Sequence, residues 1–122
     1  MMTVKELTED GLRALFCIGI TQTFYDEALS ELKDIKAALT AAFDDLEGRF
    51  GVKVLGTVDD DLLHVTATPA YPYVSYIIAE VPNLEAVIEV TNLVRTPYKE
   101  GRISRYISID VRIGHPLYFA NK

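Results

Sequence analysis

The two histidines are the side chains best suited to proton transfer, because an imidazole titrates close to neutral pH. His64 follows three consecutive aspartates, and His115 lies in a Gly-His-Pro sequence. A histidine near a carboxylate can act as a general acid or base. We therefore take His64 and His115 as candidate catalytic residues. The alternative for each is an ordinary loop or turn residue.

A metal centre at Asp59, Asp60, Asp61 and His64 is the less favoured interpretation. Consecutive carboxylates point in different directions, and a transition-metal site usually needs two or three converging imidazoles or thiolates. The chain has two histidines and one cysteine, Cys17, and it has no CxxC, HExxH or phosphate-binding glycine loop. The sequence therefore predicts a solvated acidic turn, no metal and no cofactor.

Aromatic and basic side chains supply candidates for ligand binding. Seven tyrosines and five phenylalanines suit a flat ligand, since tyrosine combines ring stacking with a hydroxyl. Tyr73, Tyr76 and Tyr106 are the candidate ligand-binding tyrosines, and we expect one or two tyrosines to line a pocket between the first helix and the sheet. Arg105, on an otherwise apolar strand face, is the candidate anchor for an acidic ligand. Its alternative is a position near the strand end, with the guanidinium in water.

Composition limits the class of protein. The chain has 122 residues, is 49% hydrophobic and carries a net charge of −6, which fits a single domain over residues 1–122 and argues against disorder. A sequence pI of about 4.8 argues against a nucleic-acid partner. No apolar run reaches the ~18 residues of a membrane span. The mixed-charge start, the lack of an apolar leader and the lone cysteine predict a cytoplasmic protein.

Hydrophobic periodicity defines the expected elements. Strands are short apolar or alternating runs, and the helices show three- and four-residue apolar spacing. Thr23 and Asn83 are the expected helix N-caps, with a possible break near Ser30. The predicted strands are 12–20, 52–58, 74–81 and 102–113, and the predicted helices are 23–50 and 83–96.

The resulting order is β-α-β-β-α-β. This is the ferredoxin-like α+β fold, a four-stranded antiparallel sheet with two helices on one face. The other face is bare in a monomer. On the last strand, Ser104, Tyr106, Ser108, Asp110 and Arg112 are expected on that open face.

The open face is also expected to carry Leu15, Cys17, Ile77 and Ala79. An apolar patch of this kind usually marks an interface, and a second copy packed face to face covers it most simply. Asp110 and Arg112 would then form a charge pair across the dimer axis or orient a ligand group. The alternative is that the C-terminal tail folds over this face.

An order of this kind with a two-faced sheet resembles the dimeric α+β barrel superfamily, which includes muconolactone isomerase-like and antibiotic-biosynthesis-monooxygenase-like proteins. Five segments resemble the IacB-type proteins of indole-3-acetic acid catabolic clusters: LFCIG at 15–19, GVKVLGTVDDD at 51–61, YIIAEVP at 76–82, TNLVR at 91–95 and VRIGHPL at 111–117. The resemblance implies a setting in aromatic catabolism and a small-molecule ligand, but no particular reaction.

The expected function is therefore that of a small cytoplasmic homodimer that binds a small aromatic, indole-acetate-type metabolite. One alternative is a cofactor-free isomerase or monooxygenase-like enzyme acting on an aromatic or lactone substrate. The other alternative is a purely structural dimer without a ligand. Fold alone does not choose between them.

Overall fold

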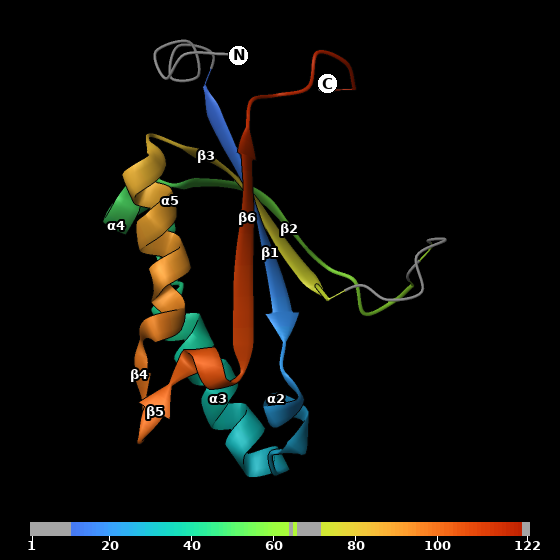
Figure 1. The fold of residues 1–122 in the computed structure, drawn as a ribbon, viewed down its shortest axis with the longest axis vertical. Coiled ribbons are helices and arrows are strands. Elements are labelled where there is room, and N and C mark those ends of the chain that lie inside the picture. Colours follow the sequence, from blue (N-terminus) through green and yellow to red (C-terminus); the bar gives the residue numbers. More distant parts are fainter. Residues whose placement is uncertain (1–10, 64, 66–71, 121–122) are drawn as a thin grey trace.

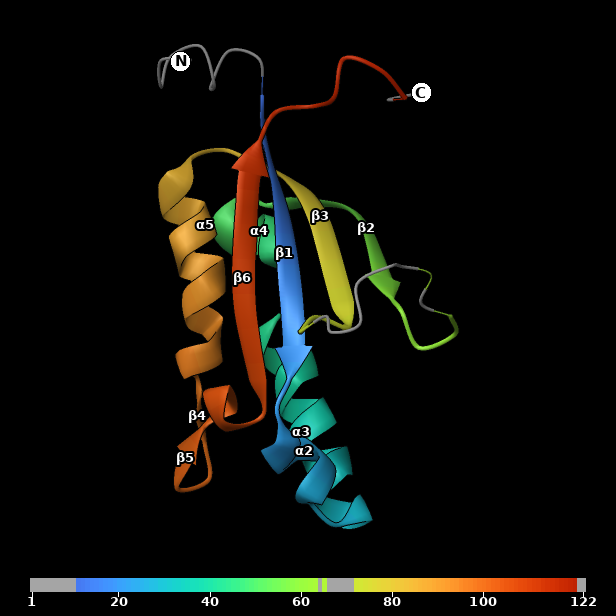
Figure 2. The same ribbon diagram turned by 45° about the vertical axis from the view of Figure 1, so that its right-hand side comes forward.

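A four-stranded antiparallel sheet in the order β2-β3-β1-β6 organises the computed structural model, which describes residues 11–63, 65 and 72–120. Helices lie on one side of this sheet (Figures 1 and 2). The predicted ferredoxin-like α+β fold is confirmed. The strands of the sheet are β1 Leu12–Ile20, β2 Lys53–Asp59, β3 Ser75–Val81 and β6 Ile107–Gly114. The remaining elements are α2 Gln22–Asp26, α3 Leu29–Ala42, α4 Leu46–Phe50, α5 Leu84–Thr91, the 3₁₀ turns η1 Asn92–Arg95 and η2 Ile103–Arg105, and the short hairpin β4 Pro97–Tyr98 and β5 Gly101–Arg102.

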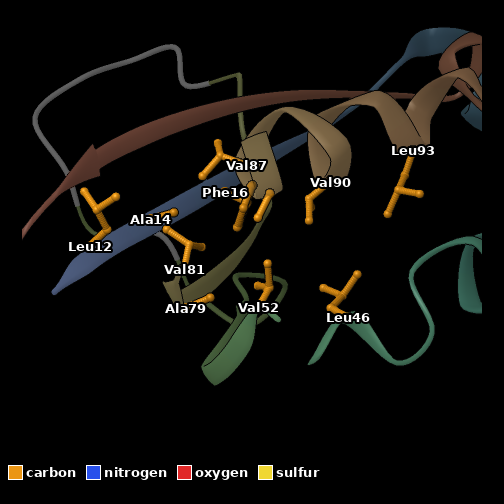
Figure 3. Packing of buried hydrophobic residues seen from close by; sticks show 11 residues of the cluster. Leu12, Ala14, Phe16, Leu46, Val52, Ala79, Val81, Val87, Val90 and Leu93 are labelled. Atoms are coloured by element: carbon orange, nitrogen blue, oxygen red, sulfur yellow. The ribbon is translucent and has the colours of Figure 1, made fainter. Parts of the chain in front are cut away.

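The central strand β1 pairs with β3 on one side and with β6 on the other. Its alternate residues Leu12, Ala14 and Phe16 are buried beneath the helices. Figure 3 shows them in one cluster with Val87 and Val90 of α5. Losing a fully buried aromatic such as Phe16 typically costs about 3–5 kcal/mol of stability, so this half of the sheet is the firmly packed half.

The predicted long helix 23–50 is three shorter helices. Glu27 and Ala28 have an extended backbone, which ends α2 and starts α3. Ala28 lies two residues before the expected break at Ser30. A second break follows Ala42, where Asp45 adopts a left-handed conformation and accepts a hydrogen bond from the Gly48 amide. Gly51, with φ +73°, ends α4 as predicted, because glycine adopts that conformation without strain.

The second predicted helix begins where expected but buries a different face. The Asn83 side chain accepts a hydrogen bond from the Ala86 amide, which confirms the N-cap. The apolar spacing of this helix predicts one face made of Leu84, Val87, Ile88, Thr91 and Val94, but Leu84 and Ile88 are exposed. The buried residues are instead Ala86, Val87, Val90 and Leu93, because the sheet meets the helix about one residue out of phase with the predicted stripe.

The last strand starts at Ile107, five residues later than predicted. Residues Ile103–Arg105 form a 3₁₀ turn, held by hydrogen bonds that Thr21 donates to the carbonyls of Arg105 (2.6 Å) and Tyr106 (2.9 Å). This turn ends the strand alternation. Tyr106, predicted to lie on the open face, is therefore 2% exposed and packs among the core residues. Arg105 does not lie on a strand at all.

Register assigns the faces of the two remaining strands and corrects the predicted open face. Ile77 pairs with Phe16 and Ala79 with Ala14, so both face the helices rather than the open side. The open positions of β3 are instead Tyr76 and Ile78, opposite Cys17 and Leu15.

A register irregularity between Val54 and Gly56 alters the alternation of β2. The alternation of residues 52–58 predicts one strand face made of Val52, Val54, Gly56 and Val58, and the irregularity makes this prediction wrong. Val54 pairs with Ala79 of the helix-covered face, whereas Val58 pairs with Tyr76 of the open face.

Part of the open face is covered by the chain itself. A Cβ built on Gly19 would lie 2.7 Å from the carbonyl oxygen of Pro72 and 2.7 Å from the Ser108 hydroxyl, so Pro72 crosses closely over β1. The tail after β6 leaves the sheet at the end opposite α2 and α3 (Figure 2). Among the described residues, the tail reaches the open face near Leu15 and Ile78, and Cys17 in the middle of that face is 2% exposed.

We predict that Gly19→Ala destabilises the protein by about 1–3 kcal/mol, because the added methyl meets a backbone carbonyl that cannot move aside freely. Urea unfolding measures the change. Gly114→Ala is the control, since a Cβ there meets nothing within 4 Å. Equal unfolding free energies for the two variants would show that Pro72 does not cross over β1 in this way.

Candidate functional site

A cavity lies between α2–α3 and the helix-covered face of the sheet, at the end where β1 finishes. Its volume is about 700 Å³, within the range of about 300–1,000 Å³ common for small-molecule sites. Its walls are largely apolar. They comprise Ile18 and Ile20 of β1, Phe24 of α2, Leu39 and Phe43 at the helical side, and Val74, Ile77 and Ile107 from the sheet.

Polar side chains gather on the same cavity. Asp59 ends β2 and pairs with Ser75 of β3 on the helix-covered face, so both side chains lie on the cavity side of the sheet. Asp60 and Asp61 follow directly. From the helical side come Tyr25 of α2 and Lys36 and Thr40 of α3. The arrangement is an apolar hollow bordered by carboxylates, hydroxyls and one ammonium group.

Backbone hydrogen bonds hold the acidic end of β2 in place. The Asp60 amide donates to the Val74 carbonyl at 2.9 Å, and the Val74 amide donates to the Ile18 carbonyl at 2.9 Å. These two bonds tie the aspartates through β3 to the central strand. On the other side, Thr21 caps α2 by accepting from the Phe24 amide, which sets Phe24 and Tyr25 at the cavity. The site therefore rests on ordered backbone on both sides.

Two of the predicted ligand-binding tyrosines lie on the opposite side of the sheet from this cavity. The Tyr73 hydroxyl donates to an Asp110 carboxylate oxygen, and the Tyr76 hydroxyl lies 3.4 Å from the Tyr73 carbonyl. The hydrogen bond to Asp110 is the main cause of a raised pKa of the Tyr73 phenol, and partial burial is the second cause. Cys17 faces the same side, and burial raises the pKa of its thiol. These groups form an open-face cluster.

The other two predicted ligand-binding residues lie at the β4–β5 hairpin. Tyr106 packs edge-to-face on Tyr98 with ring centroids 5.8 Å apart, and its hydroxyl lies 3.5 Å from the Glu27 carboxylate. Arg105 is exposed, with its guanidinium 5.5 Å from the Tyr106 ring centre. The exposed Arg105 side chain therefore lies over the buried Tyr106 ring, close to the predicted alternative in which the guanidinium is in water.

Neither predicted catalytic histidine is described at this cavity. His115 is exposed beyond β6, with its Nδ1 3.1 Å from the Pro116 carbonyl oxygen, and it borders a separate hollow of about 470 Å³ on the open face. His64 lies outside the described residues. The structure brings Tyr73 close to Tyr76, and Arg105 close to Tyr106 at a separate hollow, but neither pair lines this cavity. The roles of these residues stay predictions.

The predicted solvated turn agrees with the exposure of Asp59 and Asp61. The strand directions explain why these aspartates also border the cavity. Because β1 and β2 both run antiparallel to β3, they run parallel to each other. Their carboxyl ends, Ile20 and Asp59, therefore lie at the same end of the sheet. The first helix starts at that end of the sheet, so the acidic residues that end the second strand lie near the start of this helix.

Within the described part of the chain, no three His, Cys, Asp or Glu side chains converge as a metal-binding group. Over the same residues, no helix has the length and apolarity needed to cross a membrane. The described chemistry of the cavity is therefore that of carboxylates, hydroxyls and an ammonium around apolar walls.

Comparison with known proteins identifies the fold and no family. No family model and no curated protein matches the chain. Among solved structures it is similar to the chlorite dismutase-like protein TA0507, with a TM-score of 0.50 and 14% identity. The match covers 88% of this chain but 44% of that protein, so the chain spans less than half of its length.

A second similar structure is a dimeric protein of unknown function with a ferredoxin-like fold from Bacteroides fragilis. It has a TM-score of 0.41 and 10% identity, and the match covers 84% of this chain and 95% of that one. At these identities a likeness concerns the fold alone, and the second match is too distant to support an argument. The resemblance to IacB-type proteins stays a prediction.

We predict that the Tyr73 phenol ionises at a higher pH than an unperturbed tyrosine, because its proton is held by the Asp110 carboxylate. Spectrophotometric titration of the tyrosines should show a late-ionising component, and Tyr73→Phe should remove part of it. Tyr118→Phe, at a tyrosine of the tail that is 94% exposed, is the control and should leave the late component in place. An unchanged late component in Tyr73→Phe would contradict the bond to Asp110.

Proposed function

We propose that the chain is a homodimeric binding protein for a small aromatic metabolite, and that the 700 Å³ cavity beneath α3 is its binding site. The observation that supports this most directly is the combination of apolar walls and a few polar side chains in one hollow. Sites for small organic ligands generally have this composition, since the walls exclude water and the polar groups fix orientation.

The walls favour a flat ligand. Phe24 and Phe43 supply aromatic faces from the helical side, and Ile18 and Ile77 supply aliphatic surface from the sheet. Burying an aromatic ring between such surfaces removes apolar area from water, at about 25 cal/mol per Å². An indole ring is a suitable model for the ligand, in keeping with the predicted setting in aromatic catabolism.

The open face supports the homodimer part of the proposal. Ile78 and Val58 are exposed there, 37% and 59% respectively, beside the partly buried Leu15. Asp110 and Arg112 lie two residues apart on the same face of β6. In a two-fold contact the same patch meets itself, so an acid and a base two residues apart can pair with their counterparts. Pro72 and Tyr73 of each copy would form part of that contact.

We also keep the cytoplasm as the proposed compartment, because the single cysteine is a free buried thiol. The acidic net charge of −6 supports a partner other than nucleic acid.

A cofactor-free enzyme is the second candidate, and the carboxylates at the cavity favour it over a purely structural dimer. Asp59 lies beside Ser75 on the cavity side of the sheet, where a bound ligand would be within its reach. A carboxylate in that position can accept a proton from a substrate. Turnover would then accompany binding, so chromatography of the ligand after incubation separates an enzyme from a binding protein.

We predict that indole raises the melting temperature of the protein by a few degrees when it is present well above its dissociation constant, because only the folded state has the cavity. Ser75→Phe should abolish this stabilisation by filling the cavity from the sheet. Ser104→Phe is the matched control, since Ser104 is exposed and lines no part of the cavity. An equal shift in both variants, or no shift in the wild type, would refute the proposed site.

We predict a mass of about twice 13.6 kDa by light scattering at micromolar concentration. Arg112→Asp should shift the protein to a monomer by placing like charges together at the two-fold contact. The double variant Asp110→Arg/Arg112→Asp should restore the dimer, because it exchanges the two partners. A wild-type monomer would disprove the homodimer.

A further inference from the structure

We infer that the cavity discriminates by charge, and that it takes neutral or cationic aromatic ligands, such as aromatic amines, and excludes aromatic acids. This inference rests on the proposed function, because it concerns what the same cavity binds. It also narrows that function, since an indole-acetate-type acid becomes the disfavoured member of the aromatic class.

The charges of the described lining carry the inference. Asp59, Asp60 and Asp61 contribute three carboxylates, and Lys36 contributes one ammonium. The described lining therefore carries a net charge of two negative units. The carboxylates come from one short segment at the end of β2, whereas Lys36 lies across the cavity on α3. Among the described lining residues, the charged side chains at the end of β2 are all carboxylates.

These carboxylates are not neutralised by the ion pairs among the described residues. Those pairs join Arg13 to Glu80, and Lys99 to Glu31 and Asp34. All of them lie away from the cavity, and none involves the three aspartates. Asp60 is tied down through its backbone amide, which leaves its carboxylate available to a ligand.

The apolar walls strengthen this effect. Charges interact more strongly beside low-dielectric surfaces than in open water, and clefts lined with one sign of charge concentrate ligands of the other sign. A ligand ammonium close to Asp59 can make charge-assisted hydrogen bonds. A ligand carboxylate would have to reach Lys36 while passing the aspartates. The net charge of −6 on the whole chain acts in the same direction during approach.

Calorimetric titration with indole, indole-3-ethylamine and indole-3-acetate tests the inference, because the three probes share one ring system. We expect the amine to bind tightest and the acid weakest, with about a tenfold difference between them at low ionic strength. High salt should reduce that difference, since Asp59 and Asp61 are exposed and their charges are screened by ions.

The variant Asp59→Asn/Asp60→Asn/Asp61→Asn should remove the preference while it keeps indole binding, because asparagine has nearly the same shape. Glu89→Gln, an exposed change of one charge on α5, should leave the order unchanged. If indole binds but the acid binds as tightly as the amine, the charge inference fails and the binding site stands. If the preference survives the triple change, the inference fails as well. If no probe binds, the proposed function fails with it.

Discussion

The pairing of β1 with both of its neighbours is the constraint on which the rest of the structure depends. Side chains alternate between the two faces of a strand, so a one-residue slip would exchange every buried residue of the sheet for an exposed one. The register Phe16 opposite Ile77 and Val111 places apolar residues of three strands on one face. Both the packed core and the cavity lie on that face, and the Tyr73–Asp110 cluster lies on the other.

Along the helix-covered face, the helices pack closely at one end and leave a hollow at the other. α5 and α4 cover Leu12, Ala14 and Phe16 so well that these residues are almost fully buried. At the other end the chain breaks at Glu27 and Ala28, and α2 and α3 leave Ile18 and Ile77 lining open space. Unfilled apolar space costs stability, so a fold that keeps it gains most when a ligand fills it.

Local patterns in the sequence were enough to predict the element order, the first strand and the Asn83 cap, because each rests on neighbouring residues. The late start of β6 could not be predicted in this way. Ile103, Arg105 and Ile107 alternate like a strand, but hydrogen bonds with the distant Thr21 and with Thr96 help to hold residues 103–105 in a turn. The irregularity in β2 is likewise a matter of pairing with β3. The position of the aspartates at the cavity follows from the strand directions rather than from a sequence motif. β2 finishes at the same end of the sheet at which α2 begins.

The central claim is that a small aromatic ligand occupies the hollow between α3 and the sheet. Mapping backbone amide chemical shifts during titration with indole tests it most directly. We expect the shifts to concentrate on residues around the hollow, such as Phe24, Thr40, Asp60 and Ser75. Shifts that concentrate instead on Cys17, Ile78 and Arg112 of the open face would contradict it, and so would the absence of any shift.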